Sequence, residues 1–226
     1  MEERGIIAIP GFSEPVSSFT HLFVTPLFLV LAILLLIRRK GQMGTLFYHL
    51  LYIFSVFFMF SISGVYHLLQ PGGTPRAVLQ RLDHAGIFLL IAATFTPVHG
   101  ILFTGFKKWG IISIIWVYAA TAIALKSIFF ASIPEWLSLT LYLTMGWIGG
   151  YSGYLVKKEY GNKLLSPLVL GAVYYTIGAV IDFLKFPVLI KGVLEAHEIF
   201  HIFVILGVFY HWKFIYSFAN KENFLH

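Results

Sequence analysis

The hydrophobic residues of this chain form long uninterrupted runs, neither alternating nor confined to one stripe. A bilayer crossing takes about 20 apolar residues at about 1.5 Å of rise each, and seven runs reach that length. They cover residues 19–37, 45–69, 82–103, 109–129, 136–156, 164–184 and 193–214. Because backbone groups in lipid must be hydrogen-bonded within the segment, continuous runs predict helices and not a β-barrel. We therefore predict an all-α integral membrane bundle of seven transmembrane helices.

Short connections separate the runs and carry glycine, proline, lysine or arginine, as in Pro71-Gly72-Gly73-Thr74-Pro75. None resembles an inter-domain linker. We predict a short N-terminal segment (1–18), one seven-transmembrane helical domain (19–214) and a short C-terminal tail (215–226). The fifth run holds glycines at 146, 149, 150 and 153. Small residues at helical spacing predict close packing between helices, with homodimerisation as the alternative use.

The composition supports a membrane protein. Hydrophobic residues make up 58% of the 226 and charged residues only 12%, whereas soluble domains are about a quarter charged. The net charge of +6 comes from short Lys/Arg clusters between the apolar runs, without interleaved aromatic residues. That arrangement is typical of headgroup contact and argues against nucleic acid. The chain has no cysteine, so disulfides and thiolate metal ligands are excluded.

Ionisable groups inside the spans are costly and indicate function. His67 lies near the end of the second run, Asp83 at the start of the third, and His197 and His201 at the start of the seventh. Followed through the membrane, all four fall on the side of the N-terminus. His197 and His201 are four apart and share a helix face. With His67 as third ligand, Zn²⁺ would keep a fourth position for water. We interpret the remaining span histidines as helix–helix hydrogen-bonding residues: His21, His49, His99 and His211.

Two carboxylates compete for the role of general base. Asp83 could hold the metal-bound water and take its proton, and Ser63 offers a hydroxyl one turn before His67. The segment from His197 to His201 also matches HExxH, in which the glutamate, here Glu198, is the base of zinc proteases. Glu198, however, is displaced by about 100° from His197 around the helix. We therefore favour Asp83 and keep Glu198 as the alternative.

Three ordered motifs resemble those of the hemolysin III family: Ser63-Gly-Val-Tyr-His67, Arg81-Leu-Asp83-His-Ala-Gly86-Ile and His197-x-x-x-His201. This is the bacterial branch of the progestin and adipoQ receptors, in the superfamily that includes alkaline ceramidases. Residues 14–21 (EPVSSFTH) resemble the N-terminal E-x-x-N/S-S-x-T/S-H element of the family. The resemblance implies seven helices around a zinc ion held by the three histidines. It also implies a water held by Asp83, Ser63 nearby, and a place in the bacterial inner membrane.

The leading functional hypothesis is a zinc-dependent membrane hydrolase that cleaves a lipid amide or ester through a zinc-bound hydroxide. Ceramide-like amides follow from the resemblance. The partner would be a membrane lipid or fatty acid, entering an apolar cavity beside the metal from the bilayer. The alternative is a non-enzymatic sensor or receptor, similar to the adiponectin receptors, with a structural zinc. The Lys/Arg distribution favours an outside N-terminus and the resemblance a cytoplasmic one, so the orientation stays open.

Overall fold

The computed structural model describes residues 5–39 and 43–220. Residues 1–4, 40–42 and 221–226, and with them half of the predicted C-terminal tail, lie outside the described residues. The described chain is an all-α bundle, as predicted. Its helices are α1 (Pro15–Arg38), η1 (Met43–Thr45), α2 (Leu46–Leu68), α3 (Thr74–Leu102), α4 (Gly105–Ile128), α5 (Glu135–Trp147), α6 (Gly149–Tyr160), α7 (Asn162–Leu184) and α8 (Ala196–Phe218).

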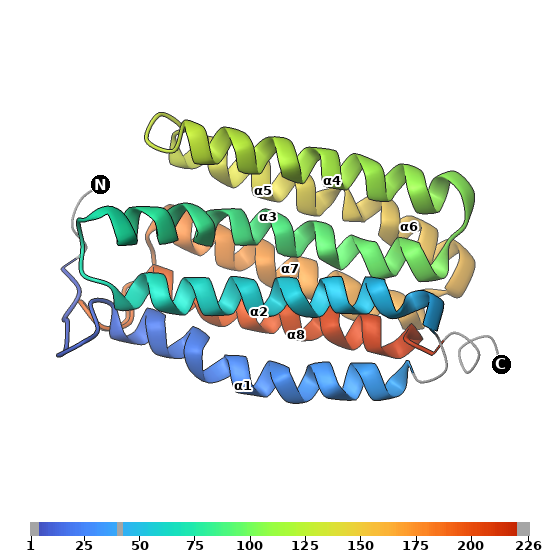
Figure 1. Cartoon of the computed structure of the whole chain (residues 1–226), viewed down its shortest axis with the longest axis horizontal. Helices are drawn as coiled ribbons and strands as arrows, with labels where there is room; N and C mark the ends of the chain where they lie inside the picture. Colours follow the sequence, from blue (N-terminus) through green and yellow to red (C-terminus); the bar gives the residue numbers. More distant parts are fainter. Residues whose placement is uncertain (1–4, 40–42, 221–226) are drawn as a thin grey trace.

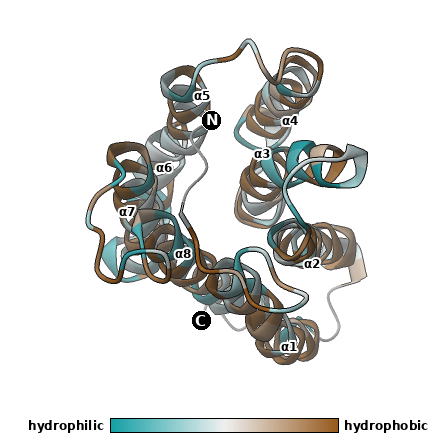
Figure 2. Ribbon diagram, turned by 90° about the vertical axis from the view of Figure 1, so that its left-hand side faces the viewer, coloured by the Kyte–Doolittle hydropathy of each residue, from teal (hydrophilic) through white to brown (hydrophobic). Residues whose placement is uncertain are grey.

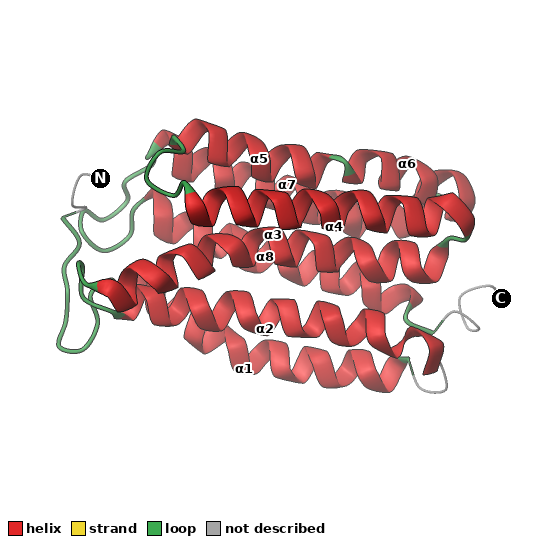
Figure 3. Cartoon of the chain, turned by 45° about the horizontal axis from the view of Figure 1, so that its top comes forward, coloured by secondary structure: helices red, strands yellow, loops and turns green. Residues whose placement is uncertain are grey.

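The helices lie side by side along one axis (Figure 1). The segment before α1 and the α2–α3, α4–α5 and α7–α8 connections gather at one end, which we call the N-terminal end of the bundle. The α3–α4 and α6–α7 connections lie at the opposite end, as Figure 3 also shows. This arrangement places segments that are distant in sequence beside one another at the N-terminal end.

Six helices are long and apolar enough to cross a membrane by themselves: α1, α2 with η1, α3, α4, α7 and α8. The fifth predicted span is divided into α5 and α6, with Ile148 between them. The Ile148 backbone stays helical, at φ −54° and ψ −27°, so the two pieces continue in one direction over residues 135–160. The chain is therefore a multi-pass integral membrane protein.

Helix α3 stands between α2 and α4 in the bundle (Figure 2), and it is the most buried of the six long helices. In its most apolar stretch 78% of the residues are buried, against 17–39% in the other five long helices. Its side chains enter both hydrophobic cores, with Leu90 and Val98 in one and Phe88 and Phe95 in the other. A helix surrounded by protein does not face lipid, and it can therefore carry polar residues at modest cost.

The start of α3 differs from the prediction. The helix begins at Thr74, with Pro75 in its first turn, and not near residue 82. Proline fits the first helical turn, where its missing N–H has no partner to lose. Hydropathy detects only the apolar part of a helix, so the polar first turns were assigned to a loop. Asp83 consequently lies within α3 and does not open it. Helix α1 also starts before residue 19, and α8 covers Ala196–Phe218 instead of residues 193–214.

The glycines of the fifth span only partly follow the packing prediction. A Cβ on Gly149 or Gly153 would lie 3.4 or 3.3 Å from a neighbouring side chain, as expected for close packing. A Cβ on Gly146 or Gly150 would meet no heavy atom of the chain within 4 Å. For these two the prediction of packing within the chain is wrong.

Two glycine-to-alanine substitutions test the packing, one at a close helix contact and one beside open space. A Cβ on Gly178 of α7 would lie 2.6 Å from the Cβ of Phe203 in α8. Gly178→Ala should therefore lower the free energy of unfolding by about 1–3 kcal/mol, as overpacking does. Gly150→Ala should be neutral, or stabilising by up to about 1 kcal/mol through helix propensity. Unfolding of the purified protein in mixed micelles measures both, and equal effects would contradict the packing described.

Candidate metal centre

Three histidines converge at the N-terminal end of the bundle. His67 comes from the last turn of α2, and His197 and His201 come from the first turns of α8. One ligand atom from each lies within 4.8 Å of the others, and the Nε2 atoms of His67 and His197 are 3.4 Å apart. His67 and His201 are buried, and His197 is partly exposed. The structure thus brings together the three residues that the sequence proposed as metal ligands.

The outer nitrogen of His67 contacts a carboxylate. Its Nδ1–H donates to Oε2 of Glu14 at 2.5 Å, and Glu14 also forms an ion pair with Arg76. The backbone N–H of Glu14 donates in turn to the carbonyl of His67 at 3.0 Å. The guanidinium of Arg76 donates to the carbonyls of Tyr66 and Leu69. Residue 14 and Arg76 therefore satisfy the free carbonyls at the end of α2 while they orient its histidine.

The other two rings are held in the same way. Nδ1–H of His197 donates to Oδ1 of Asp182 in α7 at 3.0 Å. Nδ1 of His201 lies 3.3 Å from the hydroxyl oxygen of Thr20 in α1. That hydroxyl donates its own proton to the carbonyl of Ser17 at 3.0 Å, so its oxygen accepts from His201.

These bonds set the tautomer of each imidazole. A neutral ring with its proton on Nδ1 carries a lone pair on Nε2. The facing Nε2 atoms of His67 and His197 are then two acceptors with no proton between them, an arrangement that a cation between them relieves. Metal-binding histidines commonly donate their second N–H to a carboxylate or another oxygen. Three imidazole nitrogens fit Zn²⁺ as a ligand set, so the residues present fit this metal.

The segment 14–21 of the first helix surrounds the cluster. Besides the contacts of Glu14 and Thr20, Ser18 donates to the carbonyl of Gly64 at 2.8 Å. The ring of His21 stacks on that of His201, with centroids 4.0 Å apart and planes at 14°. Sequence reasoning had singled out this segment only as part of a resemblance. The feature of the sequence that could have marked this segment as part of the site is its polar residues, which recur on one face of an otherwise apolar run.

The prediction that four span histidines form hydrogen bonds between helices holds for two of them. His99 bonds Ser152 across α3 and α6 at 2.8 Å, and His211 bonds a carbonyl of α7 at 3.2 Å, which confirms the interpretation for both. His49 bonds the carbonyl of Thr45, one turn away, at 2.9 Å and joins no second helix. Neither ring nitrogen of the buried His21 has a hydrogen-bond partner among the described residues. The interpretation is therefore wrong for His49 and His21.

Asp83 and Ser63 lie on the helices next to the cluster. Ser63 is buried one turn before His67. Asp83 is half-buried on α3, and its charge acts on the imidazole of His67. Within the described part of the chain its carboxylate has no hydrogen bond or ion pair. A carboxylate in that position is available to a water molecule at the metal.

The carboxylate of Glu198 is occupied by the fold. Its Oε1 accepts the hydroxyl proton of Ser17 at 2.7 Å. Its Oε2 accepts the backbone N–H of Glu195 at 3.0 Å, as one half of a capping box that starts α8. Glu198 is only 1% exposed. The HExxH match thus places its glutamate in a helix cap, which favours Asp83 over Glu198 as the base.

The fold and the site define a multi-pass α-helical membrane protein with a tri-histidine cluster at one end of the bundle. Residues 12–212 match the family described as "Haemolysin-III related". The chain is 30% identical to Hemolysin-3 of Bacillus cereus over 199 residues, 86% of either chain. It is 28% identical to the Hemolysin-3 homolog of Bacillus subtilis (strain 168) over 153 residues, 68% of either chain. The protein belongs to the haemolysin III family.

If Glu198 serves the fold, its removal should cost stability. Glu198→Ala deletes the cap and leaves the hydroxyl of Ser17 without its acceptor, so the free energy of unfolding should fall by about 1–3 kcal/mol. Glu159→Ala is the control, because Glu159 forms only a partly exposed pair with Lys107 and such pairs contribute little. Thermal unfolding of both variants is the measurement, and an unchanged midpoint for Glu198→Ala would contradict the structural role.

Proposed function

We propose that this haemolysin III family protein is a zinc-dependent membrane hydrolase that cleaves an amide or ester bond in a lipid. The observation that carries the proposal is the pairing of two features at one site. Three imidazoles have their Nδ1 atoms bonded outward, to Glu14, Asp182 and Thr20, which leaves their Nε2 lone pairs for a metal. Beside them, Asp83 is a carboxylate that the fold does not use.

Each residue has a chemical role in this proposal. Zinc held by His67, His197 and His201 would supply a water molecule with a pKa of about 7 and would polarise a carbonyl group. Asp83 would orient that water, take its proton as the water oxygen bonds to the carbonyl carbon, and pass the proton to the leaving nitrogen or oxygen. Ser63 would donate a hydrogen bond to the carbonyl oxygen as charge develops on it. The products are a carboxylic acid and an amine or alcohol.

The position of the cluster supports a lipid substrate. The ligands lie in membrane-length helices, and the connections at this end are short: residues 69–73 between α2 and α3, and 185–195 between α7 and α8. Such connections leave little chain for a recognition domain. A substrate already dissolved in the bilayer needs none. Ceramide-like amides are the first class to test, because of the resemblance to the alkaline ceramidases.

Metal analysis tests the site itself. We expect about one zinc per purified chain, lost in His67→Ala and His197→Ala. Asp182→Ala keeps all three ligands but removes the acceptor of His197, and should lower zinc affinity by about 10- to 100-fold. Glu135→Ala is the control, because Glu135 is an exposed acid at the same end, paired with Lys185. Full zinc retention in a His67→Ala/His197→Ala double variant would end the proposal.

Turnover of a panel of lipid amides and esters, with and without chelator, tests the reaction. Asp83→Asn should lower kcat by at least about 100-fold while zinc stays bound, as expected when a general base is lost. Glu198→Gln should lower kcat far less, because a glutamine can still fill the capping position. The opposite ranking would make Glu198 the base. Zinc binding without turnover of any panel member would favour the non-enzymatic sensor with a structural zinc.

A further inference from the structure

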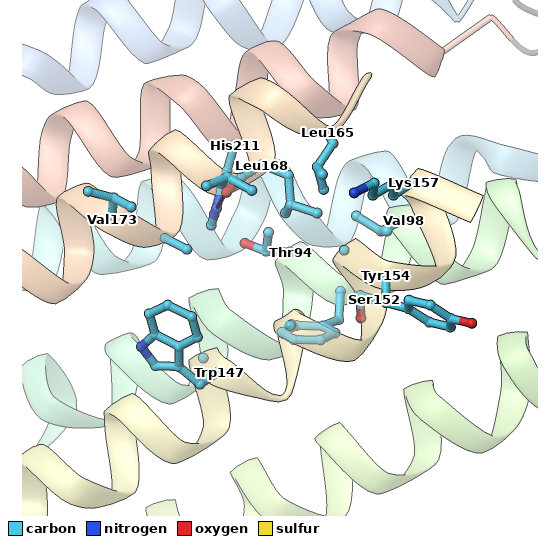
Figure 4. Close-up of a pocket in the computed structure, with 17 residues that line it drawn as sticks. Thr94, Val98, Trp147, Ser152, Tyr154, Lys157, Leu165, Leu168, Val173 and His211 are labelled. Carbon is cyan, nitrogen blue, oxygen red and sulfur yellow. Dashed lines mark hydrogen bonds between the residues drawn. The ribbon is translucent and has the colours of Figure 1, made fainter. Parts of the chain in front are cut away.

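A second feature lies toward the opposite end of the bundle. Side chains of α3, α5, α6, α7 and α8 line an apolar cavity of about 350 Å³ (Figure 4). Its residue on α8 is His211, ten positions beyond His201 and so about 15 Å along the helix. None of the five predicted site residues lines it. This cavity is therefore distinct from the one we expected beside the metal.

The wall of the cavity offers little to water. Most of its residues are apolar or glycine. The hydroxyl groups of Thr94 and Ser152 and Nε2 of His211 are hydrogen-bonded within the protein, at 2.7, 2.8 and 3.2 Å. Nδ1 of His211 is the one buried polar side-chain atom of the lining without a partner among the described residues. A buried water needs two to four polar partners. The cavity thus suits an apolar occupant.

Two glycines keep the space open. Gly146 and Gly150 both line the cavity, and a Cβ on either would meet nothing within 4 Å. Glycine costs a helix interior about 1 kcal/mol relative to alanine, and here no close helix contact within the chain compensates for that cost. The missing side chains instead widen the cavity between α5, α6 and α7.

The rim of the cavity faces the outside of the bundle. Trp147 and Tyr154 line it and are 55% and 58% exposed, Trp147 at the middle of the fifth span and Tyr154 nearer its end. The ammonium group of Lys157 stands at the same rim (Figure 4), and it has no hydrogen bond or ion pair among the residues that the structure describes. The neighbouring acid, Glu159, is paired with Lys107. The open end of the cavity is therefore positively charged.

We propose that this cavity binds one acyl chain of an anionic phospholipid from the leaflet opposite the histidine cluster, with the phosphate at Lys157. The apolar interior accounts for the chain, the exposed rim for its entry from the bilayer, and the unpaired lysine for the charge of the headgroup. A lysine near the membrane surface contributes about 1 kcal/mol to the binding of an anionic lipid. The proposal does not depend on the hydrolase, because it uses none of the residues at the histidine site.

Lipid retention tests the proposal. Wild type and variants are reconstituted in phosphatidylcholine nanodiscs with a minor fraction of phosphatidylglycerol, extracted into detergent, and analysed for lipid retained per chain. Gly150→Phe fills the cavity without a backbone clash and should lower phosphatidylglycerol retention by about tenfold or more. Lys157→Gln should lower it about fivefold and leave phosphatidylcholine unchanged. Lys158→Gln, which removes the neighbouring charge outside the cavity, should have little effect.

Gly146→Leu fills the same space from one turn away. It replaces Gly150→Phe in the test if the melting temperature and size-exclusion profile of Gly150→Phe show that this variant does not fold. Wild-type retention of phosphatidylglycerol in a folded cavity-filling variant would overturn the proposal. Equal loss in Lys157→Gln and Lys158→Gln would overturn the assignment of the phosphate to Lys157. Preferential retention of added oleic acid over phosphatidylglycerol would overturn the phospholipid and make a free fatty acid the occupant.

Discussion

The hydrogen bonds to the outer nitrogens of His67, His197 and His201 are the constraint on which the N-terminal end of the bundle depends. In a membrane interior a buried N–H group without a partner costs several kcal/mol. Here the partners come from three other parts of the chain: Glu14 before α1, Asp182 on α7 and Thr20 on α1. Satisfying the imidazoles therefore fixes α1 and α7 against α2 and α8. The same bonds orient the three rings toward one point, so the packing of this end and the convergence of the three histidines have a single cause.

The charges around the cluster also favour a cation at this site. Glu14 is paired with Arg76, and Asp182 lies 3.9 Å from Lys185, whereas Asp83 has no cationic partner among the described residues. Asp83 therefore leaves a negative charge beside the histidines that no cation of the described residues offsets, which is unfavourable in a partly buried place. A divalent cation would remove that imbalance. Asp83 is half-buried on α3, before the deeply buried stretch of that helix, and its charge acts on the imidazole of His67.

The sequence was sufficient for the spans and for the proposed ligands, because both leave local patterns: apolar runs of membrane length, and two histidines one helical turn apart. It was insufficient where the partner is distant. Glu14 and His67 are 53 residues apart and Thr20 and His201 are 181 apart, and no spacing rule connects such pairs. Hydropathy also missed the polar first turns of α3, since it reports contact with lipid and not the helical backbone. Whether a glycine meets a neighbouring helix or a cavity depends on which way its face is turned, and that is known only once the helices are packed.

The role of Glu198 shows that the place of a motif within its helix decides its chemistry. Helix α8 begins at residue 196, so His197 lies in its first turn. This start puts Glu198 at the third helical position, where a glutamate side chain reaches back to the N–H of the capping residue. The carboxylate of Glu198 is therefore directed toward the helix start, and it is also bonded to α1 through Ser17. Because this acid serves the fold, the base of the hydrolase that we propose would come from another helix. Among the acids discussed at this end, the one left without a structural bond within the described residues is Asp83 on α3.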